Sequence, residues 1–293
     1  MNTSRRTFLK YSALAASSAF LFPEELLSVQ KKAGIHESVL NQKFELAKNE
    51  GLAEKSMSEV MAAIGQSFLE QPYKEHTLEQ QGKERLVVNL KEFDCVTFVE
   101  NTLAISRCIK LKKTSFEEFK MQLQFIRYRG GTINGYPSRL HYFSDWIDDN
   151  EKKGVVKNVA QELGGSPFEK QINFMSTHRT AYKQLKSERF YKAIKSQEAE
   201  LNARKHFFIQ KQNVQAVREQ ILDGDIVGIA TTIDGLDITH TGMAFRFQGY
   251  LRLLHAPLSG GTIQITKRTI VDYLGQEESR TGIMLARPLE PTE

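Results

Sequence analysis

The sequence predicts a single α+β domain with helices first and an antiparallel sheet last. In most of residues 34–220, apolar residues recur at the three- and four-residue spacing of amphipathic helices. From residue 225 onward the pattern changes to short β-branched and aromatic runs separated by turns. The chain has 293 residues, 40% of them hydrophobic and 26% charged, which is enough for one large soluble domain.

The first residues have the pattern of an export signal. Ser4-Arg5-Arg6-Thr7-Phe8-Leu9-Lys10 resembles the twin-arginine signal, and the modestly apolar residues 11–22 follow it. This run is too short to span a bilayer, which takes about 20 residues in a helix, and it has no cysteine for a lipid anchor. We therefore expect a signal peptide at residues 1–27, one domain at residues 28–293, and a periplasmic mature protein without a membrane anchor.

Two further elements are predicted before residue 94. Residues 34–71 form a polar helical region, and residues 85–90 have the composition of a strand. Pro72 and Tyr73 lie in the connection between them, because proline does not continue a helix.

A helix is predicted over residues 94–110, with Asp94 as its N-cap and Cys95 in its first turn. Helix N-terminal N–H groups and the macrodipole stabilise negative charge and lower a thiol pKa, so Cys95 is a candidate nucleophile. Most free cysteines are instead buried core residues. The other cysteine, Cys108, lies about 20 Å further along a continuous helix, so we expect no disulfide and a core position for it.

A large, mostly helical insertion is predicted at about residues 111–220. It is polar and rich in lysine, and glycine-containing loops interrupt it at residues 129–137 and 163–167.

The C-terminal part contains the predicted sheet, with strands at residues 225–230, 239–247, 250–256, 261–266 and 282–287. Gln248-Gly249 is the tight turn of a hairpin between the second and third of these strands. Gly242 lies inside a strand, where a glycine often marks the close approach of another backbone.

Two histidines on neighbouring predicted strands, His240 and His255, complete a candidate catalytic set with Cys95. Each histidine alone is more often a satisfied core residue, but adjacent antiparallel strands can bring two side chains together. His240 is the predicted general base, and His255 would hydrogen-bond its other ring nitrogen. Asp237 is a rival for that orienting role, although its three-residue spacing from His240 favours the opposite face of a strand.

Other classes of function find less support. Cys95, His240 and His255 are possible zinc ligands, but no further cysteine or histidine has a useful spacing, so we predict no metal and no cofactor. The net charge of +5 favours an anionic ligand weakly, and no nucleic-acid-binding module is visible. The sequence does not specify an oligomeric state.

Short motifs resemble those of NlpC-type, papain-like cell-wall cysteine hydrolases, in that family's order. Phe93-Asp94-Cys95-Val96-Thr97-Phe98-Val99 resembles the nucleophile motif, and Pro72-Tyr73 precedes it as in the family. The other motifs are Asp223-Gly224-Asp225-Ile226-Val227, His240-Thr241-Gly242 and Leu254-His255-Ala256. The resemblance covers residues 70–100 and 220–270, and implies a papain-like core with the nucleophile helix packed on an antiparallel sheet or barrel.

Departures from that pattern resemble the N-acetylmuramoyl-L-alanine amidase-like branch. Val96-Thr97 replaces the usual Ser-Gly, Pro257 stands where serine is usual, and residues 135–147 are similar to a segment of that branch. The resemblance implies a peptidoglycan or muropeptide hydrolase that cleaves the bond between N-acetylmuramic acid and L-alanine through a Cys-His-His set. The alternatives are an endopeptidase acting between D-glutamate and the diamino acid, and a non-catalytic muropeptide-binding protein.

The implied substrate carries carboxylates and sugar rings, which arginine and aromatic side chains bind. The candidate substrate-binding residues are Tyr73, Arg127, Arg129, Tyr136, Arg139 and Trp146. The alternative for this cluster is a loop between helices with solvated arginines. His141 is either a site residue or a satisfied surface histidine.

Overall fold

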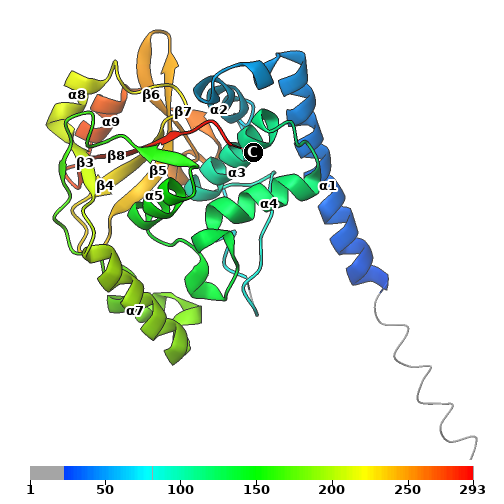
Figure 1. Cartoon of the computed structure of the whole chain (residues 1–293), viewed down its shortest axis with the longest axis horizontal. Helices are drawn as coiled ribbons and strands as arrows, with labels where there is room; N and C mark the ends of the chain where they lie inside the picture. The colour runs from blue at the N-terminus through cyan, green and yellow to red at the C-terminus, as the bar shows by residue number, and fades with distance from the viewer. Residues whose placement is uncertain (1–22, 81, 293) are drawn as a thin grey trace, which may run out of the picture.

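One antiparallel sheet of eight strands, with helices on both faces, forms the centre of the described residues, which are 23–80 and 82–292 of the computed structural model (Figure 1). The predicted α+β class is confirmed. Residues 1–22, which contain most of the predicted export signal, lie outside the described part. None of the helices in that part has both the length and the apolar composition needed to cross a membrane.

The strands follow the order β2-β3-β8-β4-β5-β6-β7 across the sheet, and β1 also pairs with β8. Their bounds are β1 Val156–Asn158, β2 Ser166–Pro167, β3 Phe207–Gln210, β4 Ile226–Thr231, β5 Ile238–Phe247, β6 Tyr250–His255, β7 Gln264–Ile265 and β8 Arg280–Pro288. The helices are α1 Pro23–Asn49, α2 Met57–Gln66, α3 Cys95–Lys110, α4 Phe116–Arg127, α5 Phe143–Lys152, α6 Phe174–Thr177, α7 Glu188–Asn202, α8 Val214–Val217 and α9 Ile270–Gly275.

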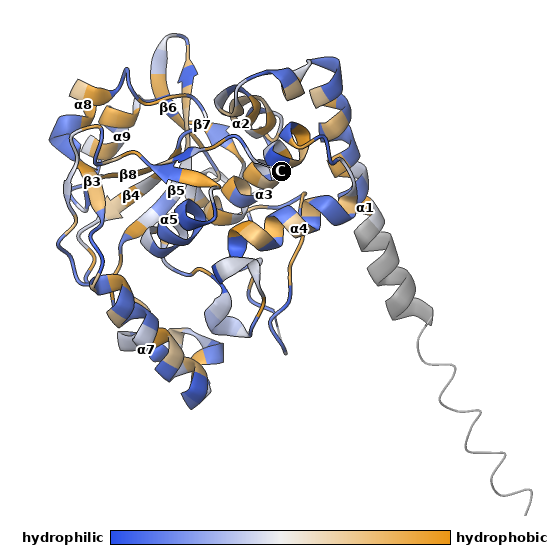
Figure 2. Ribbon diagram, in the orientation of Figure 1, coloured by the Kyte–Doolittle hydropathy of each residue, from blue (hydrophilic) through white to orange (hydrophobic). Residues whose placement is uncertain are grey.

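Helix α3 is the central helix of the fold. It packs against β5 of the sheet and is contacted by α1, α2 and α4 (Figure 1). Almost every side chain from Thr97 to Ile109 is buried. Figure 2 shows apolar residues gathered where α2, α3 and α4 meet beside the sheet. Because α3 is surrounded, its position and that of its first residue are fixed by the main core.

The sheet separates two cores. Ile226 of β4 and Met284 of β8 enter the core shared with α1 to α4, whereas their neighbours Val227 and Leu285 enter the core on the other face. This alternation follows from the two-residue side-chain period of a strand. It explains why both faces of the central strands are apolar and why β4 is buried at all six positions.

The predicted hairpin between β5 and β6 is confirmed. Gln248 and Gly249 both have positive φ, 54° and 80°, and Phe247 pairs with Tyr250 across the turn. A two-residue turn with two positive φ values matches the right-handed twist of the flanking strands. The turn fixes the register of β5 against β6, and so the relative positions of His240 and His255.

The strand predicted at residues 85–90 is wrong, because that segment is extended but unpaired. Side chains from α4 and its C-terminal end bond its backbone instead: the guanidinium of Arg127 donates to the carbonyl of Val87, and the hydroxyl of Tyr128 donates to that of Arg85. These contacts link residues about 40 positions apart, which no local pattern reveals.

The other differences concern length and continuity. The strand predicted at residues 261–266 is reduced to the two residues of β7, and the helical region at residues 34–71 is divided into α1 and α2 at Gly51, whose φ is 62°. The segment 111–220 contains helices as predicted, but it also contributes β1, β2 and β3 to the sheet. This segment therefore supplies strands of the central sheet as well as helices.

Candidate active site

Cys95 is the first residue of α3, as predicted. Asp94 caps the helix: its carboxylate accepts a hydrogen bond of 2.7 Å from the backbone N–H of Thr97, and the hydroxyl of Thr97 accepts one of 3.0 Å from the N–H of Asp94. The first N–H groups of a helix have no partner within it. Those of Cys95 and Val96 lie close enough to the sulfur to favour its charged form.

The two histidines are hydrogen-bonded to each other. Nε2 of His240 and Nδ1 of His255 are 2.7 Å apart. The strand register pairs Met243 with Leu254, so His255 lies directly opposite Gly242 and diagonal to His240. A Cβ at position 242 would lie 2.9 Å from the Cβ of His255 and from the carbonyl oxygen of Leu254. Because residue 242 has no side chain, the His255 side chain can lie across it and contact His240. The close approach predicted at Gly242 is therefore confirmed.

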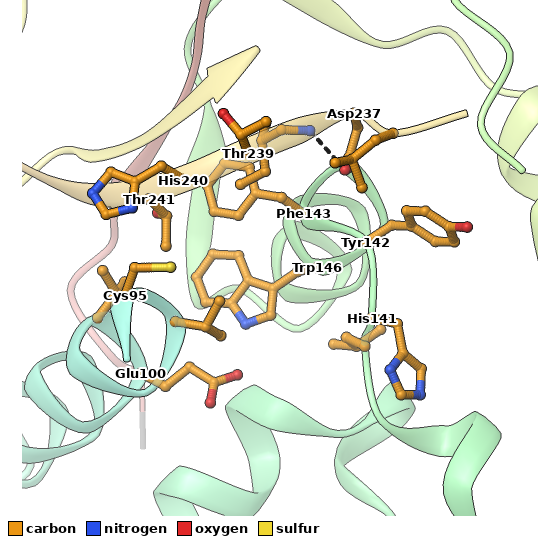
Figure 3. Close-up of a pocket in the computed structure, with 15 residues that line it drawn as sticks. Cys95, Glu100, His141, Tyr142, Phe143, Trp146, Asp237, Thr239, His240 and Thr241 are labelled. Carbon is orange, nitrogen blue, oxygen red and sulfur yellow. Dashed lines mark hydrogen bonds between the residues drawn. The ribbon is translucent and has the colours of Figure 1, made fainter. Parts of the chain in front are cut away.

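One cavity brings Cys95 and His240 together. Its volume is about 160 Å³, and both residues line it together with Thr241 (Figure 3). The N–H of Thr241 lies close to the sulfur of Cys95. No hydrogen bond joins Cys95 and His240 within the described residues, and catalytic hydrogen bonds are often long in ligand-free structures and tighten when substrate binds. Because Nε2 of His240 is bonded to His255, Nδ1 is the nitrogen left for the thiol.

The protonation states differ from the predicted thiolate. Burial, followed by the nearby charge of Asp94, raises the pKa of Cys95 to about 11, although the surrounding N–H groups act in the opposite direction. Burial, followed by Arg280, lowers the pKa of His240 to about 4. Desolvation disfavours the charged form of both groups. The expectation of a lowered thiol pKa is therefore wrong: at neutral pH the pair consists of a neutral thiol and a neutral imidazole.

We expect the rate of Cys95 alkylation by iodoacetamide to rise steadily between about pH 6 and pH 10, by about tenfold per unit, because only the thiolate reacts. With a pKa of about 11, the thiolate fraction increases over that whole range. Mass spectrometry of the labelled protein in a Cys108→Ala background measures the rate. A plateau of fast labelling at acidic pH would instead demonstrate a preformed thiolate–imidazolium pair and contradict these protonation states.

The carboxylate of Asp237 bonds to Ser144 and Ile238, whereas His240 bonds to His255. One of its carboxylate oxygens accepts hydrogen bonds of 2.8 and 2.9 Å from the N–H and hydroxyl of Ser144, and the other accepts one of 2.8 Å from the N–H of Ile238. Asp237 thus caps the N-terminus of α5, which begins at Phe143. The structure places His255 in the orienting position.

Two of the predicted substrate-binding residues lie near the nucleophile. Trp146 lines the cavity and stacks on Phe143, with ring centroids 5.7 Å apart. Tyr73 lies within electrostatic reach of Cys95, and burial followed by the charges of Cys95 and Asp94 raises its pKa to about 12.

The three arginines predicted to bind substrate each pair with a carboxylate of the protein. Arg127 is 1% exposed and donates to Glu100 at 2.6 Å, and Arg129 makes a bidentate pair with Asp145. Arg139 donates to Glu79 and to the carbonyl of Leu78. Each guanidinium is therefore held by a carboxylate of the chain itself, and that of Glu79 is exposed. Arg127 and Arg139 line a second cavity of about 200 Å³ that shares Val96, Glu100, Leu140 and His141 with the first.

Tyr136 is buried away from both cavities. The guanidinium of Arg139 lies 5.0 Å from the centre of its ring, and the ring of His141 packs against it. His141 lines both cavities, and its Nε2 lies 3.0 Å from the carbonyl oxygen of Tyr136. Burial, followed by Arg139, lowers the pKa of His141 to about 3, so this histidine is neutral at physiological pH.

Sequence reasoning missed Glu100, Phe143 and Tyr273. Glu100 is a buried carboxylate of α3, and because other buried positions of that helix are also polar, the sequence pattern did not single it out. Tyr273 of α9 packs edge-on against His255, with ring centroids 5.8 Å apart. No group of three or more histidine, cysteine or acidic residues suited to a metal occurs in the described part of the chain.

Comparison with known proteins gives one family model and several solved structures. The model, described as AmiA-like, N-acetylmuramoyl-L-alanine amidase-like, matches residues 63–283. An N-acetylmuramoyl-L-alanine amidase from Bacteroides uniformis is 36% identical over 80% of this chain and 99% of that chain, with a TM-score of 0.76. The comparison with curated proteins gives no match.

Two more structures extend the similarity. A Bacteroides fragilis protein with the provisional name xylanase is 34% identical over 77% of this chain and 99% of that chain, with a TM-score of 0.70. Protein LPG0564 from Legionella pneumophila is 20% identical over 88% of this chain and 97% of that chain, with a TM-score of 0.65. At this lower identity, the similarity concerns the fold alone.

Proposed function

Because the chain belongs to the AmiA-like, N-acetylmuramoyl-L-alanine amidase-like family, we propose that it is a cysteine-dependent amidase that cleaves the bond between N-acetylmuramic acid and L-alanine. The observation that carries the proposal is the His240–His255 hydrogen bond of 2.7 Å at the cavity that also holds Cys95. A nucleophile and a base in one pocket, with an orienter hydrogen-bonded to the base, are the parts that amide hydrolysis needs.

The proposed reaction begins from the neutral pair. The sulfur of Cys95 attacks the lactyl carbonyl carbon while Nδ1 of His240 takes the thiol proton. His240 then gives that proton to the nitrogen of L-alanine, the C–N bond breaks, and the peptide leaves as an amine. Water, activated by His240, hydrolyses the thioester, which releases the sugar acid and restores the thiol.

Two sets of hydrogen bonds support this reaction. The N–H groups of Cys95 and Val96 at the start of α3 are positioned near the sulfur, where they can donate to the oxyanion of the tetrahedral intermediate. His255 accepts the Nε2 proton of His240, which places the lone pair of His240 on Nδ1. This bond strengthens when His240 becomes positively charged.

Several finer features form part of the same proposal. The order of the motifs around Cys95, His240 and His255 supports an NlpC-type, papain-like core with an inserted middle segment. The twin-arginine-like residues 4–10 support export to the periplasm. In that compartment the enzyme meets peptidoglycan or its fragments as substrate.

Glycoside hydrolysis is a poorer fit to the pocket, although Glu100 and Asp237 both line it. A glycosidase needs one carboxyl group as an acid and another as a base or nucleophile. Glu100 is paired with Arg127, and Asp237 accepts hydrogen bonds from Ser144. Both carboxylates therefore have structural roles, and we do not extend the name xylanase to this chain.

Mass spectrometry of the products from one defined muropeptide tests the bond that is cleaved. We expect the free N-acetylmuramyl sugar and the intact stem peptide with L-alanine at its N-terminus. A sugar that still carries L-alanine and D-glutamate would instead identify the enzyme as the endopeptidase. If neither product appears, the chain is a binding protein and the proposed function is wrong.

A further inference from the structure

The cavity next to Cys95 is mostly apolar. Val99, Leu140, Phe143, Leu236 and Ile238 contribute to its walls. Its volume of about 160 Å³ is comparable to an engineered apolar cavity of about 150 Å³ that binds benzene. The cavity is therefore large enough for a small substituent of the substrate, beyond the atoms that react.

One buried donor in this cavity has no partner. Trp146 is 4% exposed, and its indole nitrogen forms no hydrogen bond within the described residues. Figure 3 shows this nitrogen on the edge of the ring nearest the Glu100 carboxylate. Buried donors are almost always paired, so an unpaired one at a binding site indicates a ligand group that accepts its hydrogen bond.

Acceptors line the same cavity. Glu100 and Asp237 are both buried and contribute carboxylate oxygens. The hydrogen bonds they accept from Arg127, Ser144 and Ile238 do not use all the lone pairs that two carboxylates provide. The cavity thus combines apolar walls, one N–H donor and carboxylate acceptors.

This combination matches a secondary amide that carries a methyl group. We propose that the cavity is a subsite for the N-acetyl group of the sugar, with the acetyl oxygen accepting from Trp146 and the amide N–H donating to a carboxylate. The inference rests on the proposed function, in which the sugar lies on the acyl side of the scissile bond. The acetamido carbon of that sugar is next to the carbon that bears the lactyl ether, so both groups can lie beside Cys95.

Kinetics with matched substrates test the subsite. We expect the wild type to prefer the N-acetylated substrate by about tenfold or more in kcat/KM over a synthetic analogue with a hydroxyl in place of the acetamido group. Trp146→Phe keeps the aromatic ring on Phe143 but removes the N–H, and should reduce this preference about tenfold. The control Cys108→Ala alters the main core outside this cavity and should leave the preference unchanged.

Fluorescence provides a second, independent measurement, because Trp146 is the only tryptophan in the chain. In the Cys95→Ala variant, the N-acetylated sugar acid should change the tryptophan emission at lower concentration than its hydroxyl analogue does. Equal binding of the two ligands, together with equal kcat/KM for the two substrates, overturns the subsite and leaves the amidase function intact. A selective fluorescence response in Cys95→Ala, together with no release of stem peptide by the wild type, supports the subsite and refutes the proposed function.

Discussion

Replacing Cys95 with alanine should reduce kcat/KM for the muropeptide amide by at least about 10⁴-fold, because removal of a nucleophile eliminates the covalent route and leaves only binding and oxyanion stabilisation. Cys95→Ser should also be strongly impaired. The raised pKa of the thiol already requires His240 to remove a proton during the attack, and a hydroxyl holds its proton more tightly still. Release of stem peptide from a defined muropeptide, followed by liquid chromatography, measures both losses.

The second cysteine provides the matched control. Cys108 lies on the same helix but is fully buried in the main core, and burial followed by Glu118 raises its pKa to about 12. Cys108→Ala should retain kcat/KM within a few fold and lose about 1 kcal/mol of stability. Equal activity of Cys95→Ala and wild type would show that the cavity binds its ligand without using the thiol.

Local signals in the sequence were sufficient to predict the elements that hold the site. Asp94 before an apolar helical pattern located the start of α3, and the Gln248-Gly249 turn located the hairpin of β5 and β6. Both signals depend on neighbouring residues, namely a cap and a two-residue turn. Once α3 and the hairpin are correct, Cys95 and the two histidines are placed on the right elements.

The electrostatics of the site could not be predicted from the sequence, because they depend on contacts between residues far apart in the chain. The effect of the helix N-terminus on Cys95 was predicted correctly in direction, but desolvation of the thiol outweighs it and raises its pKa. The role of Arg127 similarly depends on Glu100, 27 positions away, and on Val87, 40 positions away. Arginines near a glycine-rich loop suggested substrate binding, whereas in the fold each of them pairs with a carboxylate of the chain.

Replacing His255 with leucine should lower kcat by about 10²- to 10⁴-fold with little change in KM, because the His240 imidazole then loses the group that fixes its tautomer and ring orientation. His255 is 3% exposed and contacts His240 and the ring of Tyr273. Leucine fills similar space, so folding should survive; circular dichroism tests this. His255→Asn retains an acceptor near Nε2 of His240 and should recover part of the loss.

The pH dependence of His255 variants distinguishes an orienting role of this residue from a packing role. Burial, then the charge of His240, then Arg280 lower the pKa of His255 to about 3, so His255 stays neutral. In the proposed mechanism its Nδ1 accepts the Nε2 proton of His240. A neutral orienter stabilises the imidazolium less than a carboxylate does, so His255→Asp should raise the pKa of His240 and move the acidic limb of kcat/KM upward from about 4. If His255→Leu and His255→Asn retain full kcat and the pH profile of His255→Asp is unchanged, His255 is only a packing residue and the base must be oriented by another group.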